Sequence, residues 1–306
     1  MDSKKLEILM TAVDLGSFSR ASEVVGYTQS GLTHLVDSLE RDIGLTLITR
    51  DHNGISLTKE GKELMPCIRE FLRANASLEN RISAISEKRS ETIRVAAYAS
   101  IAMHWMPEIL YRFRRVCPEI NVDLRMVDNA LEPFKLLESG RTDVIFAARQ
   151  SRISCDWTPL YSDIMYAILP PDYKTLSKES FSIDEYEGRE FLMPYGKFDI
   201  DVNAALEKNG VKPNIRQAHV DDETVIRMVG KGLGISMMSE MMIKGRTNGV
   251  KVLPISPVTA RELGMGTDIN ARMTEGLAQL KSCVLDFTGG LQTDFIGKRC
   301  GTVYCD

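Results

Sequence analysis

Residues 16–44 read GSFSRASEVVGYTQSGLTHLVDSLERDIG, and glycines and hydroxyl residues divide this stretch into short helices. Ser17 is a natural N-cap for a helix that stops at Gly26, because its hydroxyl can accept from a free amide of the first turn. Thr28 has the same role for a helix over 29–43. Two short helices separated by a turn after a glycine predict a helix-turn-helix.

The flanking residues complete a small domain. Leu6, Leu9 and Val13 recur at helical spacing and predict a helix before the quoted stretch. After it, 45–50 and 54–58 are expected to be two strands joined by a turn that contains Asn-Gly, a strong hairpin signal. We therefore expect a winged helix-turn-helix domain over residues 1–58.

The next segment, residues 59–90, predicts one long helix of about 40 Å up to residue 85. A helix of this length with an apolar seam and no core of its own requires a partner. Antiparallel pairing of two copies would dimerise the protein; packing on the chain's own C-terminal half is the alternative. The seam contains Leu64, Ile68, Phe71, Leu72, Leu78, Ile82 and Ile85.

Residues 91–306 alternate between strand and helix patterns, which predicts parallel α/β units. Their layout resembles the periplasmic-binding-protein-like fold, in which two lobes enclose a cleft. We expect lobe I at about 91–161 and 265–306, and lobe II at about 162–264. The expected strands are 93–98, 120–126, 143–147, 190–193, 215–220, 232–236 and 263–269, and the expected helices are 99–113, 131–137, 200–208, 223–229 and 274–287.

The chain resembles the LysR-type transcriptional regulators along nearly its whole length, on motifs that are specific by their order and spacing. In the head these are Gly16-Ser17-Phe18-Ser19-Arg20-Ala21, Thr28-Gln29-Ser30, Leu39-Glu40, Gly44-Leu45, Leu47, Arg50 and Leu57-Thr58-Lys59-Glu60-Gly61. In the C-terminal half they are Arg94-Val95, Ser100, Pro107, Phe113-Arg114, Pro118 and Gly140-Arg141-Thr142-Asp143-Val144. The resemblance implies a regulator that binds operator DNA and a small-molecule effector as a homodimer or homotetramer, with RNA polymerase as a further candidate partner.

The head offers candidate DNA contacts on the third helix and the wing. A recognition helix enters the major groove by its N-terminal end, so side chains of its first turns reach base edges. Thr28 and the helix amides can hold a phosphate. The candidates on the helix are Thr28, Gln29, Ser30, Thr33 and His34, and those on the wing are Arg50, His52 and Asn53.

The charge of the head departs from the usual basic DNA-binding domain. Residues 1–65 contain seven Lys and Arg against ten Asp and Glu, a net charge of −3. Because phosphate neutralisation supplies much of DNA affinity, we expect one head to bind weakly and two or four heads to bind by avidity. The alternative is that the head mediates protein contacts only.

Candidate effector contacts follow from the carboxyl ends of the expected strands, where open α/β sheets bind ligands. They are Tyr98, Ser100, Ile101, Asn129, Arg149, Pro194, Tyr195, Phe198, His219, Asp222 and Thr224. Arg149 and the amides near Ser100 suit a carboxylate, and methionines would supply adaptable walls. These residues predict a small, partly apolar anion, and the resemblance supports the Ser100 and Pro194-Tyr195 positions.

Composition excludes several other classes of protein. The net charge of −4, with 43% hydrophobic and 26% charged residues, is that of an ordinary globular protein, and no apolar run reaches the ~20 residues of a membrane span. No catalytic, metal or cofactor motif is recognisable, so we expect neither an enzyme nor a cofactor. The N-terminus lacks an export signal and the six cysteines are irregularly spaced, which favours a reduced cytoplasmic protein.

Two alternatives share the expected fold. A solute-binding protein would need an export signal and would not carry a winged head. A thiol redox-responsive regulator would need a cysteine pair in the second lobe, but residues 156–282 contain no cysteine. Cys300 and Cys305 lie in a C-terminal tail whose role the sequence does not reveal.

Overall fold

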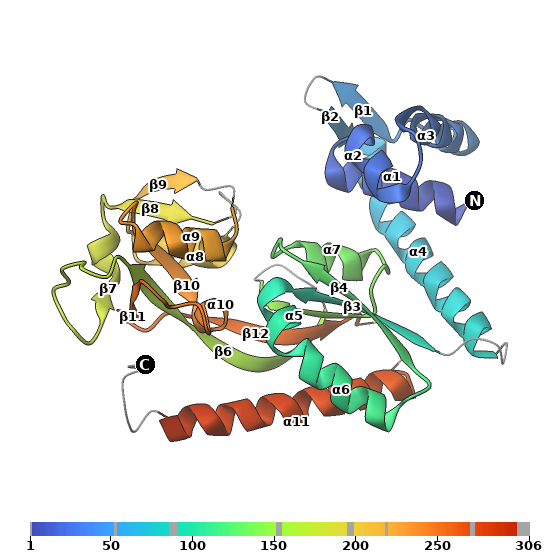
Figure 1. Ribbon diagram of the computed structural model, residues 1–306. Helices are drawn as coiled ribbons and strands as arrows, with labels where there is room; N and C mark the ends of the chain where they lie inside the picture. The colour runs from blue at the N-terminus through green and yellow to red at the C-terminus, as the bar shows by residue number, and fades with distance from the viewer. Residues whose placement is uncertain are drawn as a thin grey trace. The chain divides into compact units, whose positions relative to one another are not determined.

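The computed structural model of the chain describes residues 2–51, 54–85, 91–150, 155–194, 199–217, 220–269 and 273–298. The chain forms two compact units (Figure 1). The first contains residues 1–90 together with Glu138–Arg141, and the second contains residues 91–137 and 142–306. No helix in the described ranges is both long and apolar enough to cross a membrane.

The first unit is a helical head with a hairpin and a long final helix, which confirms the predicted winged helix-turn-helix. Ser17 accepts from the amide of Arg20 (3.4 Å), and Gly26 ends the second helix in the left-handed conformation (φ 73°). Both ends therefore form as local sequence signals predict. The elements are α1 (Ser3–Leu15), α2 (Phe18–Val25), α3 (Gln29–Ile43), β1 (Ile48–Asp51), β2 (Gly54–Leu57) and α4 (Lys59–Ile85).

Two glycines allow the hairpin to approach the helices closely. A Cβ atom on Gly61 would lie 2.1 Å from the carbonyl oxygen of Leu47, and one on Gly54 would lie 2.2 Å from that of Gly16. Gly54 also has a φ of +117°, which L side chains rarely adopt. Larger residues at either position would push the hairpin away from the head.

Helix α4 has one buried face and one exposed apolar face. Met65, Ile68 and Leu72 belong to the core of the head, where each is at most 6% exposed. Further along, Leu78 and Ile82 are more than half exposed. The first half of α4 is thus fixed to the head, whereas its second half presents apolar side chains to the surroundings.

The second unit contains two lobes joined by long strands. Lobe I contains β3 (Thr92–Tyr98), α5 (Ala99–His104), α6 (Met106–Val116), β4 (Asn121–Val127), α7 (Glu132–Glu138), β5 (Val144–Ala148) and α11 (Glu275–Lys298). Lobe II contains β7 (Phe181–Ser182), the short 3-10 helix η1 (Ile183–Tyr186), β8 (Glu190–Met193), α8 (Ile200–Lys208), β9 (Asn214–Gln217), α9 (Asp222–Gly230), β10 (Ser236–Ser239), α10 (Glu240–Ile243) and β11 (Lys251–Ser256). The joining strands are β6 (Asp156–Leu169) and β12 (Ala260–Thr267).

Helices cover both faces of the sheet in lobe I, and the side chains of β3 and β5 are buried on both sides. Successive residues of β3 point to opposite faces, so Val95 and Ala97 join the core beneath α6 and α11, whereas Ala96 joins the core beneath α7. In β5, Phe146 and Ile145 divide in the same way. The central residues of β3 and all of β5 are therefore apolar, as expected of parallel strands between helical layers.

One continuous sheet runs through both lobes, with strand order β4-β3-β5-β12-β6-β11-β7 and β10 paired to β6. The N-terminal part of β6 pairs antiparallel with β12, and residues 165–168 of β6 pair with β10. The structure confirms the predicted two-lobed α/β architecture (Figure 1). It also shows that strands, not loops, connect the lobes.

Two sequence expectations were wrong in detail, and two strands were missed. The helix expected over 99–113 is two helices that meet at Trp105, because Pro107 has no amide proton for a continuous hydrogen-bond ladder. The strand expected over 232–236 is a turn with Gly232 at φ 76°, and β10 starts only at Ser236. Strands β6 and β11 were not predicted.

Candidate functional site

The first turn of α3 is the exposed part of the head that could enter a DNA groove. The side chains of Gln29, Ser30 and His34 are exposed, and Thr33 is half-buried. Thr28 lies at the N-cap, where its hydroxyl oxygen accepts from the amide of Gly31 (3.1 Å). This helix end therefore combines exposed hydrogen-bonding side chains with the positive end of the helix dipole.

The hydroxyls of Thr28 and Ser30 also lie 3.2 Å apart and form a hydrogen bond with each other. A Cβ atom at Gly31 would lie 3.1 Å from the Thr28 hydroxyl. The absence of a side chain at Gly31 thus leaves room for the capping contact. Glycine in a helix interior costs roughly 1 kcal/mol relative to alanine. At position 31 it avoids a close contact between a Cβ atom and the capping hydroxyl of Thr28.

Arg50 of the hairpin is already engaged within the head. Its guanidinium forms an ion pair with Asp37 of α3 and lies over the ring of Phe18, 5.0 Å from the ring centroid. The pair holds strand β1 against the third helix. His52 and Asn53, the other predicted wing contacts, lie outside the described residues.

A second link joins α3 to the hairpin. The carboxylate of Glu40 accepts from the amides of Leu47 (2.6 Å) and Ile48 (3.1 Å). These two amides lie at the start of β1, so one side chain fixes the direction of this strand relative to α3. Glu40 belongs to the Leu39-Glu40 motif of the sequence analysis. Its carboxylate explains the acidic residue of that motif, because it binds the amides at the start of the hairpin.

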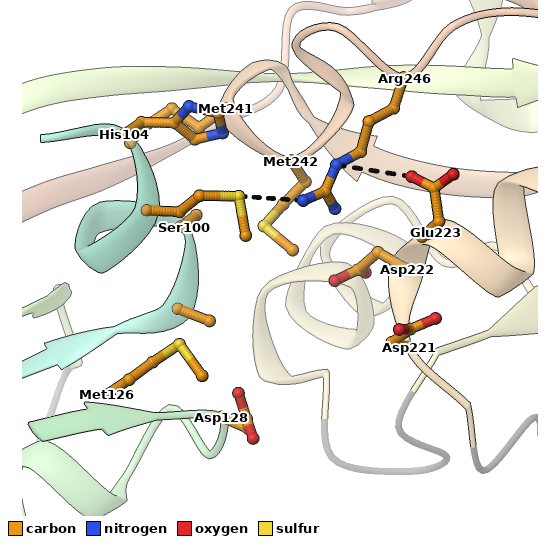
Figure 2. A pocket seen from close by; sticks show the side chains of 12 residues that line it. Ser100, His104, Met126, Asp128, Asp221, Asp222, Glu223, Met241, Met242 and Arg246 are labelled. Atoms are coloured by element: carbon orange, nitrogen blue, oxygen red, sulfur yellow. Dashed lines mark hydrogen bonds and ion pairs between the residues drawn. The ribbon is translucent and has the colours of Figure 1, made fainter.

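A pocket of about 210 Å³ lies in the second unit, and both lobes contribute equally to its lining (Figure 2). From lobe I it is lined by Ala99, Ser100, Met103, His104, Met126 and Asp128, and from lobe II by Asp221, Asp222, Glu223, Met241, Met242 and Arg246. A pocket shared by two lobes is suited to a ligand whose binding changes their relative position.

Of the predicted effector residues, Ser100 and Asp222 line this pocket. Others have local partners: Asn129 accepts from the amide of Leu131 (2.9 Å), and the amide of Thr224 donates to Asp221 (2.9 Å). Ile101 lies in the core of lobe I and Pro194 is buried in the turn after β8. Tyr195, Phe198 and His219 lie outside the described residues.

Arg149, on which the predicted anion rested, is not in the pocket lining. Its guanidinium lies 3.3 Å from the carboxylate of Glu262, and both side chains are largely exposed. An exposed pair of this kind contributes little to stability. The pairing leaves Arg149 with an ordinary surface role in the described structure.

Beside the pocket, Arg261 is the centre of a buried polar network. Its guanidinium pairs with Asp163 (2.8 Å) and donates to the hydroxyls of Ser100 (3.1 Å) and Ser239 (2.8 Å). It also lies 3.3 Å from Asp201 and 5.5 Å from the ring centroid of Tyr98. Burial alone lowers the pKa of Arg261, but the carboxylates of Asp163 and Asp201 outweigh it and raise that pKa.

The same surroundings act on Tyr98. Burial raises the pKa of its phenol, and the nearby carboxylate of Asp199 raises it further. The ring therefore remains neutral while it packs against the cation of Arg261. This places Tyr98 in the network behind Ser100 instead of in the lining of the pocket.

Asp222 is the most unusual group in the lining. Its side chain belongs to a residue that is only 5% exposed, and it has no hydrogen-bond or ion-pair partner among the described residues. Burial, together with the neighbouring charge of Asp199, raises the pKa of the Asp222 carboxyl to about 6. Figure 2 shows its carboxylate directed into the pocket.

Sequence reasoning missed most of the lining for one identifiable reason. Because the strand was expected to end at Ser236, the carboxyl-end rule did not reach Met241 and Arg246, which follow the actual end of β10. On the other side, the rule selected Asn129 where the adjacent Asp128 lines the pocket. Correct strand ends would have identified both sides.

The described cysteines do not form a redox pair. Cys67, Cys117, Cys155 and Cys283 are all outside disulfides. Burial raises the pKa of the thiols of Cys117 and Cys283, which disfavours the reactive thiolate. In the described part of the chain, no group of three or more His, Cys, Asp or Glu residues could hold a metal ion.

Comparison with known proteins gives two family matches that together span most of the chain. Residues 3–62 match the bacterial regulatory helix-turn-helix protein, lysR family. Residues 86–288 match the LysR substrate binding domain. The two matches cover the head that contains α3 and the second unit that contains the pocket.

Relatives and solved structures agree with these matches. The chain is 22% identical to the transcriptional regulator YvbU of Bacillus subtilis over 246 residues. These residues cover 80% of this chain and 84% of YvbU. It is 23% identical over 265 residues to TtuA of Agrobacterium vitis, covering 84% and 86%.

Among solved structures, full-length BenM has a TM-score of 0.59 at 16% identity and covers 95% of this chain and 98% of its own. CbnR in complex with its target DNA has a TM-score of 0.53 at 18% identity, and the match covers 94% of this chain and 100% of CbnR. At such identities the likeness concerns the fold alone, whereas the two family matches extend over both units. The chain belongs to the LysR family of transcriptional regulators.

Proposed function

We propose that this regulator binds its operator through the first turns of α3 and changes its DNA binding when a small effector occupies the pocket between the lobes. One observation carries the proposal: the pocket draws six lining residues from each lobe. A ligand there would contact both lobes at once and would favour one relative arrangement of them over the others.

For DNA recognition we assign two roles. Gln29, Ser30, Thr33 and His34 would read base edges, since amide, hydroxyl and imidazole groups form hydrogen bonds in the major groove. Thr28 and the N-terminal amides of α3 would bind phosphate. Arg50, His52 and Asn53 remain predicted wing contacts, and Arg50 would have to exchange Asp37 for a phosphate.

The exposed apolar face of α4 supports dimerisation. Phe71, Leu78 and Ile82 follow one another at spacings of seven and four residues and are 38–58% exposed. Such spacing places them on one side of a helix, and pairing with a second copy would bury them. A dimer or tetramer would hold two or more heads at fixed separation, which compensates for the acidic charge of each head.

We further propose that the protein acts in the cytoplasm, has no enzymatic activity, and has its domain boundaries at 1–58, 59–90 and 91–306. The effector residues proposed from the sequence remain so, with Ser100 and Asp222 supported by their place in the pocket.

The test begins with genome-wide mapping of the sites that the protein occupies. A duplex from the strongest site then serves as the operator in binding titrations. The Gln29→Ala variant should bind this operator weakly, whereas Gln279→Ala, the same substitution in α11, should bind as the unmodified protein does. Equal affinity of all three proteins would contradict the role assigned to α3.

A further inference from the structure

The charge of the pocket lining is strongly negative. Asp128 enters from lobe I, immediately after β4, and Asp221, Asp222 and Glu223 enter from lobe II at the start of α9. Figure 2 shows Asp128 and Asp222 on opposite sides of the opening. Four carboxylates of one sign around a cavity of about 210 Å³ create a potential that attracts cations.

The positive groups of the lining do not offset this charge. Arg246 lies 3.6 Å from Glu223 and donates to the sulfur of Met103 (2.9 Å), so its charge is balanced by one carboxylate. His104 is the other basic side chain of the lining. Burial lowers the pKa of its imidazole, with Lys244 and Arg246 adding to the effect, and so disfavours its charged form.

Asp222 adds an independent observation that points to a ligand. Asp222 is a residue only 5% exposed, and a buried carboxylate is costly unless it is paired, yet no hydrogen bond or ion pair of its side chain is found among the residues that the structure describes. It is directed into the cavity and not into the core (Figure 2). Arg246 and Arg261 act on Asp222 only through space, and a cation bound in the pocket would supply a direct ion-pair partner.

Other ligand classes fit less well. An anion would face the four carboxylates of the lining, and the guanidinium of Arg261 is already shared among Asp163, Asp201 and Ser239. A metal ion would need several converging ligands, and no such cluster exists among the described residues. An organic cation needs only one or two carboxylates.

The remaining walls of the pocket are methionines. Met103, Met126, Met241 and Met242 supply flexible apolar surface from both lobes. The cavity is smaller than the ~300–1,000 Å³ of typical drug-binding sites, which limits the ligand to a small molecule. The lining thus combines a charge-binding side with an adaptable apolar side.

We propose that the effector of this regulator is a small primary amine with a short apolar body, whose ammonium group binds Asp222 with Asp128 facing it from the other lobe. This inference rests on the proposed function, because it names the chemical class of effector for the same pocket. An ammonium group between Asp128 and Asp222 would be attracted to both lobes at once and would favour their closer arrangement.

The test uses six probes on two skeletons with the full-length protein. They are 2-phenylethylamine, 3-phenylpropanoate and 2-phenylethanol, and hexylamine, hexanoate and hexanol. Binding is measured by calorimetry and by the thermal midpoint at millimolar probe concentration. We expect at least one amine to bind and to raise the midpoint, while the matching carboxylate and alcohol do not.

Variants then locate the binding. Asp222→Asn keeps the shape of the side chain and should weaken amine binding about tenfold or more, as loss of one partner of a buried charge pair does. Asp128→Asn changes an exposed residue, endangers folding less, and should also weaken binding. Asp172→Asn, at an exposed position of the turn after β6, is the control and should bind as the unmodified protein does.

The outcomes separate the two proposals. If no amine binds, if a carboxylate or alcohol binds at least as well, or if neither Asp variant weakens amine binding, the inference is wrong. If a carboxylate binds the pocket and alters operator affinity, the inference that the effector is an amine is wrong, whereas the proposed function still holds. If amine binding depends on Asp222 but does not change operator affinity, the pocket recognises amines as inferred. The proposed function, in which the effector changes DNA binding, is then contradicted.

Discussion

Arg261 and Asp163 are directly opposite each other on the paired strands β12 and β6, and their side chains form a buried ion pair of 2.8 Å. The Asp163 side chain is fully buried and that of Arg261 is 8% exposed. The other Asp163 oxygen accepts from the amide of Met241 (3.1 Å), so the pair also fixes the start of α10. One cross-strand contact thereby joins the strands between the lobes to the edge of the pocket.

Arg261→Met should lower the free energy of unfolding by about 3–5 kcal/mol, because it leaves the Asp163 carboxylate buried without a counter-charge. The matched control is Arg149→Met, which removes an exposed pair and should cost at most about 1 kcal/mol. Urea unfolding followed by circular dichroism measures both variants. A similar small loss for the two variants would show that the network is not needed for stability.

Asp222→Asn should stabilise the ligand-free protein above neutral pH. The Asp222 carboxyl has a pKa of about 6 in the folded protein against 3.8 ordinarily, so the folded state binds its proton more tightly than the unfolded state. This group therefore favours folding at low pH, and its contribution falls as the pH rises from about 4 through 6. The loss amounts to at most about 3 kcal/mol, and Asn would abolish it.

Unfolding midpoints at pH 5 and pH 8 test this prediction. The gain from Asp222→Asn should be larger at pH 8, and Asp172→Asn should show no such difference. A gain that does not depend on pH would indicate that the effect arises from packing. The charged groups that surround Asp222 and contribute to the profile are Asp199, Asp221, Arg246 and Arg261.

Gln29→Ala and Arg50→Gln should weaken DNA binding in different ways. Loss of a base contact costs about 1–3 kcal/mol on the operator and little on unrelated DNA. Loss of a phosphate contact weakens binding to both and reduces the slope of log K against log salt by about 1. Titrations at several salt concentrations, with operator and unrelated duplexes, distinguish the two cases. An unchanged salt slope for Arg50→Gln would mean that Arg50 stays paired with Asp37 on DNA.

Leu78→Lys should dissociate the dimer, because it places a charge in the apolar face of α4. Operator affinity should fall with it, since a single acidic head would then bind alone. Leu176→Lys, at a position of lobe II that is 89% exposed, is the matched control. Sedimentation measures the mass of each variant. A Leu78→Lys dimer as stable as the control would place the interface elsewhere.

The head was predictable because its signals are local. Ser17 and Thr28 cap the helices that follow them within a few residues, as the sequence indicated. The Arg50–Asp37 pair was not predictable, because the alternation of polar and apolar residues does not show which surface charges meet across two elements. Element ends were therefore foreseen more reliably than side-chain partners.

The pocket was predictable only in part, because its geometry depends on contacts between distant residues. Arg261 joins Ser100, which lies 161 positions away, and no periodicity in the sequence indicates that pairing. The missed strand β6 alternates only loosely before its continuous buried end, so its role as the connection between lobes became visible only in the sheet. Ser100 and Asp222 were identified because both directly follow the rule for strand ends and helix starts.

The shared strands β6 and β12 also set the mechanics of signalling. The backbones of β6 and β12 pair along Asp156–Ile164, with one register shift between Leu263 and Gly264, so a rotation about one backbone torsion would disturb the pairing on either side of it. Any displacement of one lobe against the other must therefore appear as a distributed change in strand twist. Because two paired strands resist rotation more than one strand does, we expect effector binding to change the angle between the lobes by a small amount spread over several residues.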